Sequence, residues 1–333
     1  FTNHGVDNGL PVFAAAEDVA VYGMGAALGD LDGDGKRDLV LSSIGTVAWL
    51  EEDGSEWVER SGGPMSNPYG RFGYRYTWSV GIEDLDNDGD NDLLMASGNL
   101  IHLSRLGSEV QEADGLVEPS AVWLQSDGKL ASADISTLAE QVAGGRSLAT
   151  GDFDGDGQLD LLFGATDRLR LFRGVGASGH SLALELVGTV SDTHPSGARV
   201  FVDACGNRLR RDVVAGGNIT ATGDGSLHFG LGSCGDPVGV TVHWPSGIEQ
   251  SATLEPGRRR LVEPRWLTTE PLGVDRVRIT ATLPGTLQFE AVGADLADVD
   301  PMDGGLSAVV TFGPGAEIRV VRDGQTLAFR YRP

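Results

Sequence analysis

A nine-residue acidic pattern recurs three times in this sequence and constrains the fold more than any other feature. In each copy Asp occupies positions 1, 3, 5 and 9, and Gly occupies position 6. Carboxylates brought this close together repel one another in a folded chain, so the pattern predicts a cation at each copy. The copies are called loop 1 (residues 30–38), loop 2 (84–92) and loop 3 (152–160).

The side chains that the three loops offer to a cation are oxygen ligands, without His or Cys. Oxygen ligands select a hard cation, which outside the cell means Ca²⁺. Asp and Gly also mark ordinary exposed turns, but three matching copies favour three bound calcium ions. Lys36 and Gln158, at position 7, would contribute backbone carbonyls. The predicted metal-binding residues are Asp30, Asp32, Asp34, Lys36, Asp38, Asp84, Asp86, Asp88, Asp90, Asp92, Asp152, Asp154, Asp156, Gln158 and Asp160.

The first half of each loop is similar to an EF-hand loop, and the second half is not. An EF-hand has a bidentate Glu at position 12, where this chain has Leu41, Met95 and Phe163. Three apolar residues end at that position in every copy, which indicates a buried strand. Each loop is therefore predicted to lead into a β-strand.

Composition narrows the setting and the partners. A formal net charge of −23 argues against nucleic acid and anionic membrane as partners. The chain has no apolar run long enough to span a membrane, and its start at Phe1 suggests a mature or trimmed product. Cys205 and Cys234 are expected to form a disulfide in an exported protein, although two free thiols are the alternative.

The acidic loop followed by a short apolar strand resembles the FG-GAP/VCBS repeat. The resemblance covers about residues 1–176 and implies calcium-binding blades of a β-propeller, with Ca²⁺ ligands at the aspartates named above. Closed propellers have about four to eight blades, and three units carry the motif. Either degenerate units in residues 1–22 and 60–80 complete a small ring, or the array is open and exposes edge strands.

Residues 180–264 read as longer strands and resemble the ASPIC/UnbV domain that follows such repeats in cartilage acidic protein and its bacterial relatives. The resemblance rests on residues 197–200, 227–232 and 242–247, and it implies no established chemistry. Residues 266–333 are predicted to form a small Ig-like β-sandwich with a hairpin turn at Asp323-Gly324. The predicted fold is all-β: a propeller-like repeat array followed by β-sandwich-like modules.

Three other segments carry weaker patterns. The G-x-G-x-x-G run at residues 174–179 leads into a strand pattern rather than a helix, so it is interpreted as a domain linker. Residues 134–143 could form one short helix. Residues 69–78 interleave aromatic and Arg side chains, which suits either a glycan or protein contact surface or a packed loop between blades.

These observations favour an extracellular calcium-binding protein for interaction, adhesion or assembly, secreted or on the cell surface. The expected partner is a protein or glycan, including a second copy of the chain in a homo-oligomer or filament. The alternative is a metal-dependent enzyme acting on an extracellular polymer. Four carboxylates and a carbonyl nearly fill a calcium shell and leave little room for substrate, so the ions are expected to be structural and no enzyme is predicted.

Overall fold

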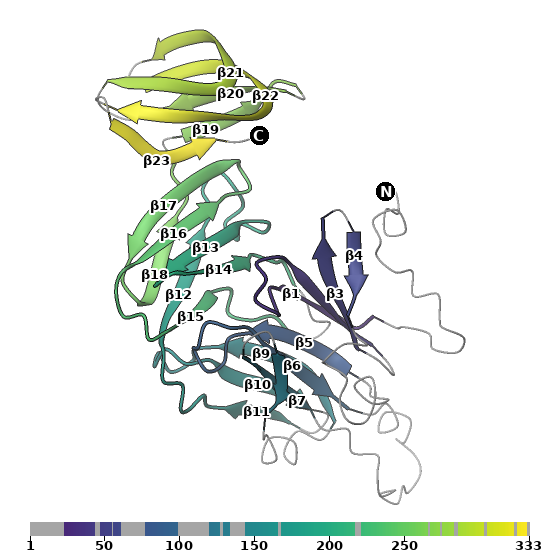
Figure 1. The fold of residues 1–333 in the computed structure, drawn as a ribbon. Coiled ribbons are helices and arrows are strands. Elements are labelled where there is room, and N and C mark those ends of the chain that lie inside the picture. Colours follow the sequence, from purple (N-terminus) through teal and green to yellow (C-terminus); the bar gives the residue numbers. More distant parts are fainter. Residues whose placement is uncertain are drawn as a thin grey trace, which may run out of the picture. The chain divides into compact units, whose positions relative to one another are not determined.

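Every regular element in the described part of the chain is a β-strand (Figure 1). The computed structural model describes residues 23–43, 47–54, 56–60, 77–98, 120–126, 129–133, 144–165, 168–216, 221–265, 267–273, 275–282, 286–302, 305–322 and 325–331. The chain divides into two compact units. The first consists of Phe1–Ala183 and Val214–Gly235, and the second of Leu184–Val213 and Asp236–Pro333.

The first unit contains three small antiparallel sheets that follow one another along the chain. Their strand orders are β1-β2-β3-β4, β5-β6-β7-β8 and β11-β10-β9, which is a propeller-like arrangement. The strands are β1 (Gly25–Gly29), β2 (Asp38–Ser42), β3 (Val47–Asp53), β4 (Glu56–Glu59), β5 (Thr77–Glu83), β6 (Asp92–Ser97), β7 (Ala121–Ser126), β8 (Lys129–Ser132), β9 (Gly145–Gly151), β10 (Asp160–Ala165) and β11 (Leu169–Phe172).

Each acidic loop connects the two strands of an antiparallel hairpin. The residue before the loop pairs with the Asp at position 9, as in Gly29↔Asp38, Glu83↔Asp92 and Gly151↔Asp160. The predicted strand after each loop is thus confirmed, because β2, β6 and β10 all begin at position 9.

The apolar runs after the loops form the core of the first unit. Val40, Leu93 and Phe163 are completely buried, one from each run. Leu31, at position 2 of loop 1, is also completely buried and joins Val40 and Leu93 in one apolar cluster. Burying a side chain of this size is worth about 1.5–3 kcal/mol, so loop 1 is anchored to the core beneath it.

The second unit is built mainly on one nine-stranded sheet. Its main order is β14-β13-β16-β17-β23-β22-β20-β19, with β21 paired to β22. These strands are β13 (Arg199–Ala204), β14 (Asn207–Asp212), β16 (Val238–His243), β17 (Ile248–Leu254), β19 (Leu267–Pro271), β20 (Arg276–Ala281), β21 (Leu287–Met302), β22 (Gly305–Arg322) and β23 (Gln325–Tyr331).

Strand β12 (His180–Val187) pairs with β15 (Leu227–Gly232) and β18 (Gly257–Val262). The division between the two units falls within β12, after Ala183, and β15 belongs to the first unit. The predicted domain limits at residues 176, 180, 264 and 266 remain a prediction. Strands β17 and β23, from either side of the predicted limit at 264, pair through Ile248↔Tyr331.

Several local predictions are confirmed. Arg322 pairs with Gln325 across the predicted hairpin turn, and Cys205 and Cys234 form a disulfide. The glycine-rich run has no regular structure before β12, but it lies wholly within the first unit, so its interpretation as a domain linker stays a prediction. The expected helix at 134–143, residues 69–76 of the aromatic segment, and the sought degenerate units at 1–22 and 61–76 lie outside the described residues.

Candidate metal centres

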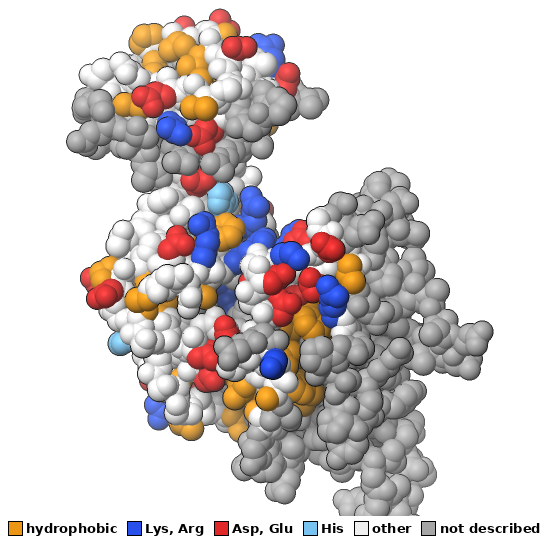
Figure 2. All heavy atoms as spheres, in the orientation of Figure 1, with side chains coloured by type: hydrophobic (Ala, Val, Ile, Leu, Met, Phe, Trp, Pro, Cys, Tyr) orange, Lys and Arg blue, Asp and Glu red, His pale blue; other side chains and the backbone are white. Residues whose placement is uncertain are grey.

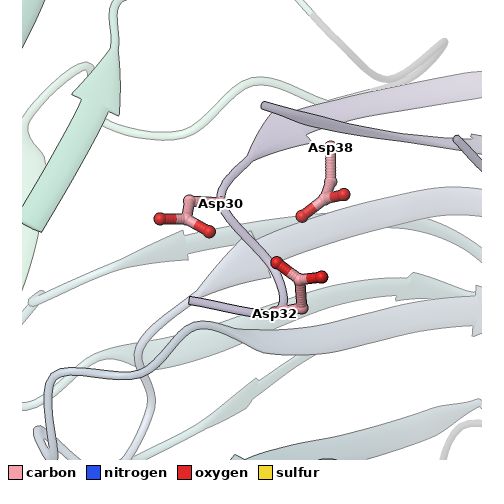
Figure 3. Close-up of side chains that lie close together, drawn as sticks. All are labelled: Asp30, Asp32 and Asp38. Atoms are coloured by element: carbon pink, nitrogen blue, oxygen red, sulfur yellow. The ribbon is translucent and has the colours of Figure 1, made fainter. Parts of the chain in front are cut away.

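In each loop the carboxylates of positions 1, 3 and 9 come together. One oxygen from each of the three residues lies within 4.8 Å of the other two. Figure 3 shows this arrangement in loop 1, where the carboxylates of Asp30, Asp32 and Asp38 surround a common space beside the hairpin. The corresponding groups are Asp84, Asp86 and Asp92 in loop 2, and Asp152, Asp154 and Asp160 in loop 3.

The position-1 carboxylate holds the turn through a backbone hydrogen bond that recurs in all three loops. The N–H of position 6 donates to Oδ2 of position 1, at 2.9 Å in loop 1, 2.9 Å in loop 2 and 3.1 Å in loop 3. Positions 4 and 6 both have a left-handed backbone, with φ of 61° at Asn87 and 103° at Gly89 in loop 2. Gly and Asn adopt this conformation at low cost, which explains their presence at these positions.

The position-9 carboxylate joins the loop to the sheet. Its Oδ2 accepts the N–H of position 2, from Leu85 at 2.8 Å and from Phe153 at 3.0 Å, and from Leu31 in the same way. Its Oδ1 accepts a donor from the following part of the chain. The donors are Trp49 Nε1 at 2.8 Å, the Gln125 backbone N–H at 2.9 Å and the Gly174 backbone N–H at 2.8 Å.

Burial and mutual repulsion make it unfavourable for these carboxylates to be ionised without a cation nearby. The pKa of Asp92 is raised to about 8 and that of Asp38 to about 7, mainly by burial and in part by the neighbouring loop carboxylates, despite the hydrogen bonds that lower both pKa values. Burial also raises the pKa of Asp30 to about 6. A cation would remove this penalty by balancing the charge. The donor set, made of oxygens, therefore fits a hard cation.

The position-5 aspartates were predicted as ligands, and they lie outside the three-carboxylate groups. Their Oδ1 atoms accept the N–H of position 7, at 2.8 Å from Lys36, 2.8 Å from Asp90 and 2.9 Å from Gln158. In loop 1 the Lys36 ammonium lies 3.1 Å from Asp34. In loop 3 Arg173 reaches both Asp154 and Asp156. Cation ligation by position 5 and by the position-7 carbonyls stays a prediction.

Loop 2 forms side-chain hydrogen bonds to both of the other loops. The Asn87 Nδ2–H donates to the Gly157 carbonyl of loop 3 at 3.0 Å, and the Asn91 Nδ2–H donates to the Asp30 carbonyl of loop 1. Loops 1 and 3 have Gly at position 4, where loop 2 has Asn. This difference is visible in the sequence, but the repeated pattern alone does not indicate what the Asn does.

Gln125 is a second residue that sequence reasoning missed. Its side chain is buried, its backbone N–H holds Asp92, and its amide nitrogen lies 3.5 Å from the place where a Cβ on Gly33 would be. Its Oε1 is also buried and accepts no hydrogen bond from the described residues. Gln125 therefore lies against the turn of loop 1 and also holds Asp92 of loop 2.

Comparison with known families matches three segments of the chain. The FG-GAP-like repeat family matches residues 23–95, the FG-GAP repeat family matches residues 144–179, and the family "ASPIC and UnbV" matches residues 188–263. No curated protein has significant sequence similarity to the chain.

One solved structure retrieved by the comparison is a proposed carbohydrate binding protein from Bacteroides uniformis, at 9% identity, 46% coverage of this chain and 95% coverage of that chain. Its TM-score of 0.17 is too low to support any argument about fold or ligand. The family matches, together with the three hairpin loops, identify the chain as an FG-GAP repeat protein with an ASPIC/UnbV domain.

Proposed function

We propose that this chain is an extracellular protein that binds three calcium ions, one in each acidic loop, and uses the stabilised repeats for interaction or assembly. The observation that carries the proposal is the threefold recurrence of one arrangement: carboxylates of positions 1, 3 and 9 with oxygens within 4.8 Å of one another. A chance surface cluster would not repeat with the same backbone hydrogen bonds at every copy.

Calcium suits this donor set better than the other common metals. Zinc favours His and Cys ligands, which the groups lack, and magnesium requires near-ideal octahedral geometry. A turn rich in Gly and Asp tolerates the irregular shell of six to eight oxygens that calcium accepts. The position-5 carboxylates and position-7 carbonyls lie in the same turn and are proposed to complete the shell with water.

The proposed role of the ions is structural. Position 1 follows the first strand of each hairpin, and position 9 begins the second. An ion bound by both therefore joins the two strands at the loop end of the hairpin. Stability gained in this way depends on the free calcium concentration and reaches about 2.7 kcal/mol per site at 100 times the dissociation constant.

Strand β11 is the proposed contact surface within the described residues. It pairs with β10 alone among the described strands, so its other edge has no strand partner within the described residues. Leu169 and Leu171 are 71% and 59% exposed on it. An open edge with exposed apolar side chains favours pairing with another chain, and a second copy of this protein is the proposed partner.

The disulfide and the FG-GAP repeats are typical of extracellular proteins. Among the described residues there is no helix with the length and apolar character needed to cross a membrane. Figure 2 shows basic side chains among the acidic ones on the visible face, so the negative charge is not spread uniformly over it.

Calorimetric titration with Ca²⁺ after chelator treatment tests the function. The expected result is three sites with affinities in the micromolar to millimolar range of extracellular modules, and weaker binding of Mg²⁺. Asp32→Asn, Asp86→Asn and Asp154→Asn should each remove one site. Finding fewer than two sites in the unaltered chain would refute the proposal.

A further inference from the structure

Several backbone and side-chain contacts of loop 2 converge on Asn87. Asn87 is 1% exposed and adopts φ of 61°. Strand β15, which lies in the region matched by the ASPIC/UnbV family, supplies two of these contacts. The N–H of Gly232 donates to the Asn87 carbonyl at 2.8 Å, and His228 Nε2 lies 2.7 Å from Asn87 Oδ1.

The orientation of the Asn87 amide follows from its partners. Its Nδ2–H donates to the Gly157 carbonyl, which can only accept a hydrogen bond. Oδ1 therefore faces His228, and His228 Nε2 must carry the proton that it donates to Oδ1. His228 is itself 3% exposed. A single buried amide thus connects loop 2 with loop 3 and with β15.

Two glycines allow the surrounding chain to approach this closely. A Cβ placed on Gly230 of β15 would overlap Asp84 Oδ2, and it would lie 2.6 Å from the Asn87 Cα. A Cβ on Gly179 would overlap the Asn87 carbonyl oxygen. Asp84 is the position-1 carboxylate of loop 2. The backbone of β15 therefore lies directly against one of the proposed calcium ligands.

We propose that strand β15 is a structural part of the loop 2 calcium site, so that calcium binding there and docking of residues 227–232 stabilise each other. The inference rests on the proposed function, because it requires calcium in loop 2. This segment of the ASPIC/UnbV region then has a definite role, since it covers loop 2 and positions Asp84. Coupling of two sites is reciprocal, so loss of either partner must weaken the other.

The coupling predicts an effect on backbone exchange. Hydrogen–deuterium exchange of residues 227–232 should slow by about tenfold when calcium binds the unaltered chain. Asn87→Gly restores the residue that loops 1 and 3 have at position 4, and it keeps access to positive φ. This variant should keep three sites but bind calcium more weakly at loop 2 and lose most of the slowing. Asn91→Ala removes the contact with loop 1 instead and should retain the slowing.

A second variant tests the close approach. Gly230→Ala should displace Asp84 and reduce the calcium stoichiometry from three to two. Gly239→Ala is the matched control, because a Cβ on that strand glycine would meet its nearest atom at an ordinary 3.8 Å. Calorimetry on both variants gives the site count.

The two hypotheses fail in different ways. An unaltered chain that binds no calcium would refute the proposed function and this inference together. Two results would overturn this inference alone, provided that the unaltered chain binds three calcium ions. One is hydrogen–deuterium exchange at residues 227–232 that does not depend on calcium. The other is full calcium affinity at loop 2 in both Gly230→Ala and Asn87→Gly.

Discussion

The indole Nε1–H of Trp49 donates a hydrogen bond to Oδ1 of Asp38 at 2.8 Å. Both residues are buried, and they lie on neighbouring strands, β3 and β2. The bond orients a carboxylate of the loop 1 cation group and lowers its pKa against the larger effect of burial. Trp49 is thus both a core residue and a support for the proposed ligand.

Replacing Trp49 with Phe tests that double role. Trp49→Phe keeps a ring in the core but removes the hydrogen-bond donor. Because the lost hydrogen bond is to a charged group, we expect the free energy of unfolding to fall by about 1.5–3 kcal/mol. Calcium affinity at loop 1 should fall, and loops 2 and 3 should be unaffected. Denaturant unfolding and calorimetric titration measure the two effects. Unchanged loop 1 affinity would show that Asp38 does not depend on the indole.

The position-5 aspartates provide a test of calcium-linked stability. Asp34→Ala, Asp88→Ala or Asp156→Ala should lower the melting temperature in calcium and change it little after chelation, because a bound ion stabilises by mass action. Each variant also removes the acceptor of one backbone N–H in the turn. Equal losses in both conditions would mean that the carboxylate acts only as a turn residue.

Arg173 should compete with calcium in loop 3. Its guanidinium contacts Asp154 and lies 2.8 Å from Asp156, on a side chain that is 62% exposed. Because the pair is exposed, its contribution to stability is small, but the positive charge must move or be screened when calcium binds. Arg173→Gln should therefore raise loop 3 affinity by about threefold to tenfold. The exposed Arg199→Gln serves as control, and equal affinities in both variants would contradict the prediction.

Calcium affinity should depend on pH with a definite sign. The folded-state pKa values of about 7 for Asp38 and about 8 for Asp92 lie above the ordinary value of 3.8. Without calcium, the folded state therefore binds protons more tightly than the unfolded state. The resulting stability is fully present below pH 3.8 and is lost as pH rises through the folded-state values.

Calcium and protons compete for the same carboxylates, so calcium affinity should rise over the same interval, with protons released on binding. Melting temperatures measured from about pH 4 to about pH 9 should fall with rising pH in chelator and fall less, or rise, in calcium. Parallel curves in the two conditions would contradict this linkage.

Self-association through β11 is the prediction for assembly. Leu169→Asp together with Leu171→Asp should abolish concentration-dependent growth of particle size, because charge at an apolar edge opposes strand pairing. Val262→Asp, at a side chain that is 48% exposed in the second unit, is the control. Light scattering over micromolar concentrations in calcium gives the size. A strictly monomeric unaltered chain would remove the basis for a second copy as partner.

Local features of this protein could be read from the sequence because they depend on residues close together in the chain. Nine residues predict that the carboxylates of positions 1, 3, 5 and 9 converge, since a turn with Gly at position 6 brings its two ends side by side, and positions 1, 3 and 9 do so. The apolar run after position 9 likewise determines the strand, and Asp323-Gly324 the hairpin. These predictions needed no knowledge of the remaining chain.

The tertiary structure decided what surrounds the loops. The oxygen Oδ1 of position 9 accepts a hydrogen bond from a different kind of donor in each loop: Trp49 in loop 1, Gln125 in loop 2 and Gly174 in loop 3. No common sequence pattern predicts these donors. Asn87 and Gly230 are far apart in the sequence and meet only because β15 folds into the first unit. Contacts of this kind depend on how distant strands pack, and the spacing within one loop carries no information about them.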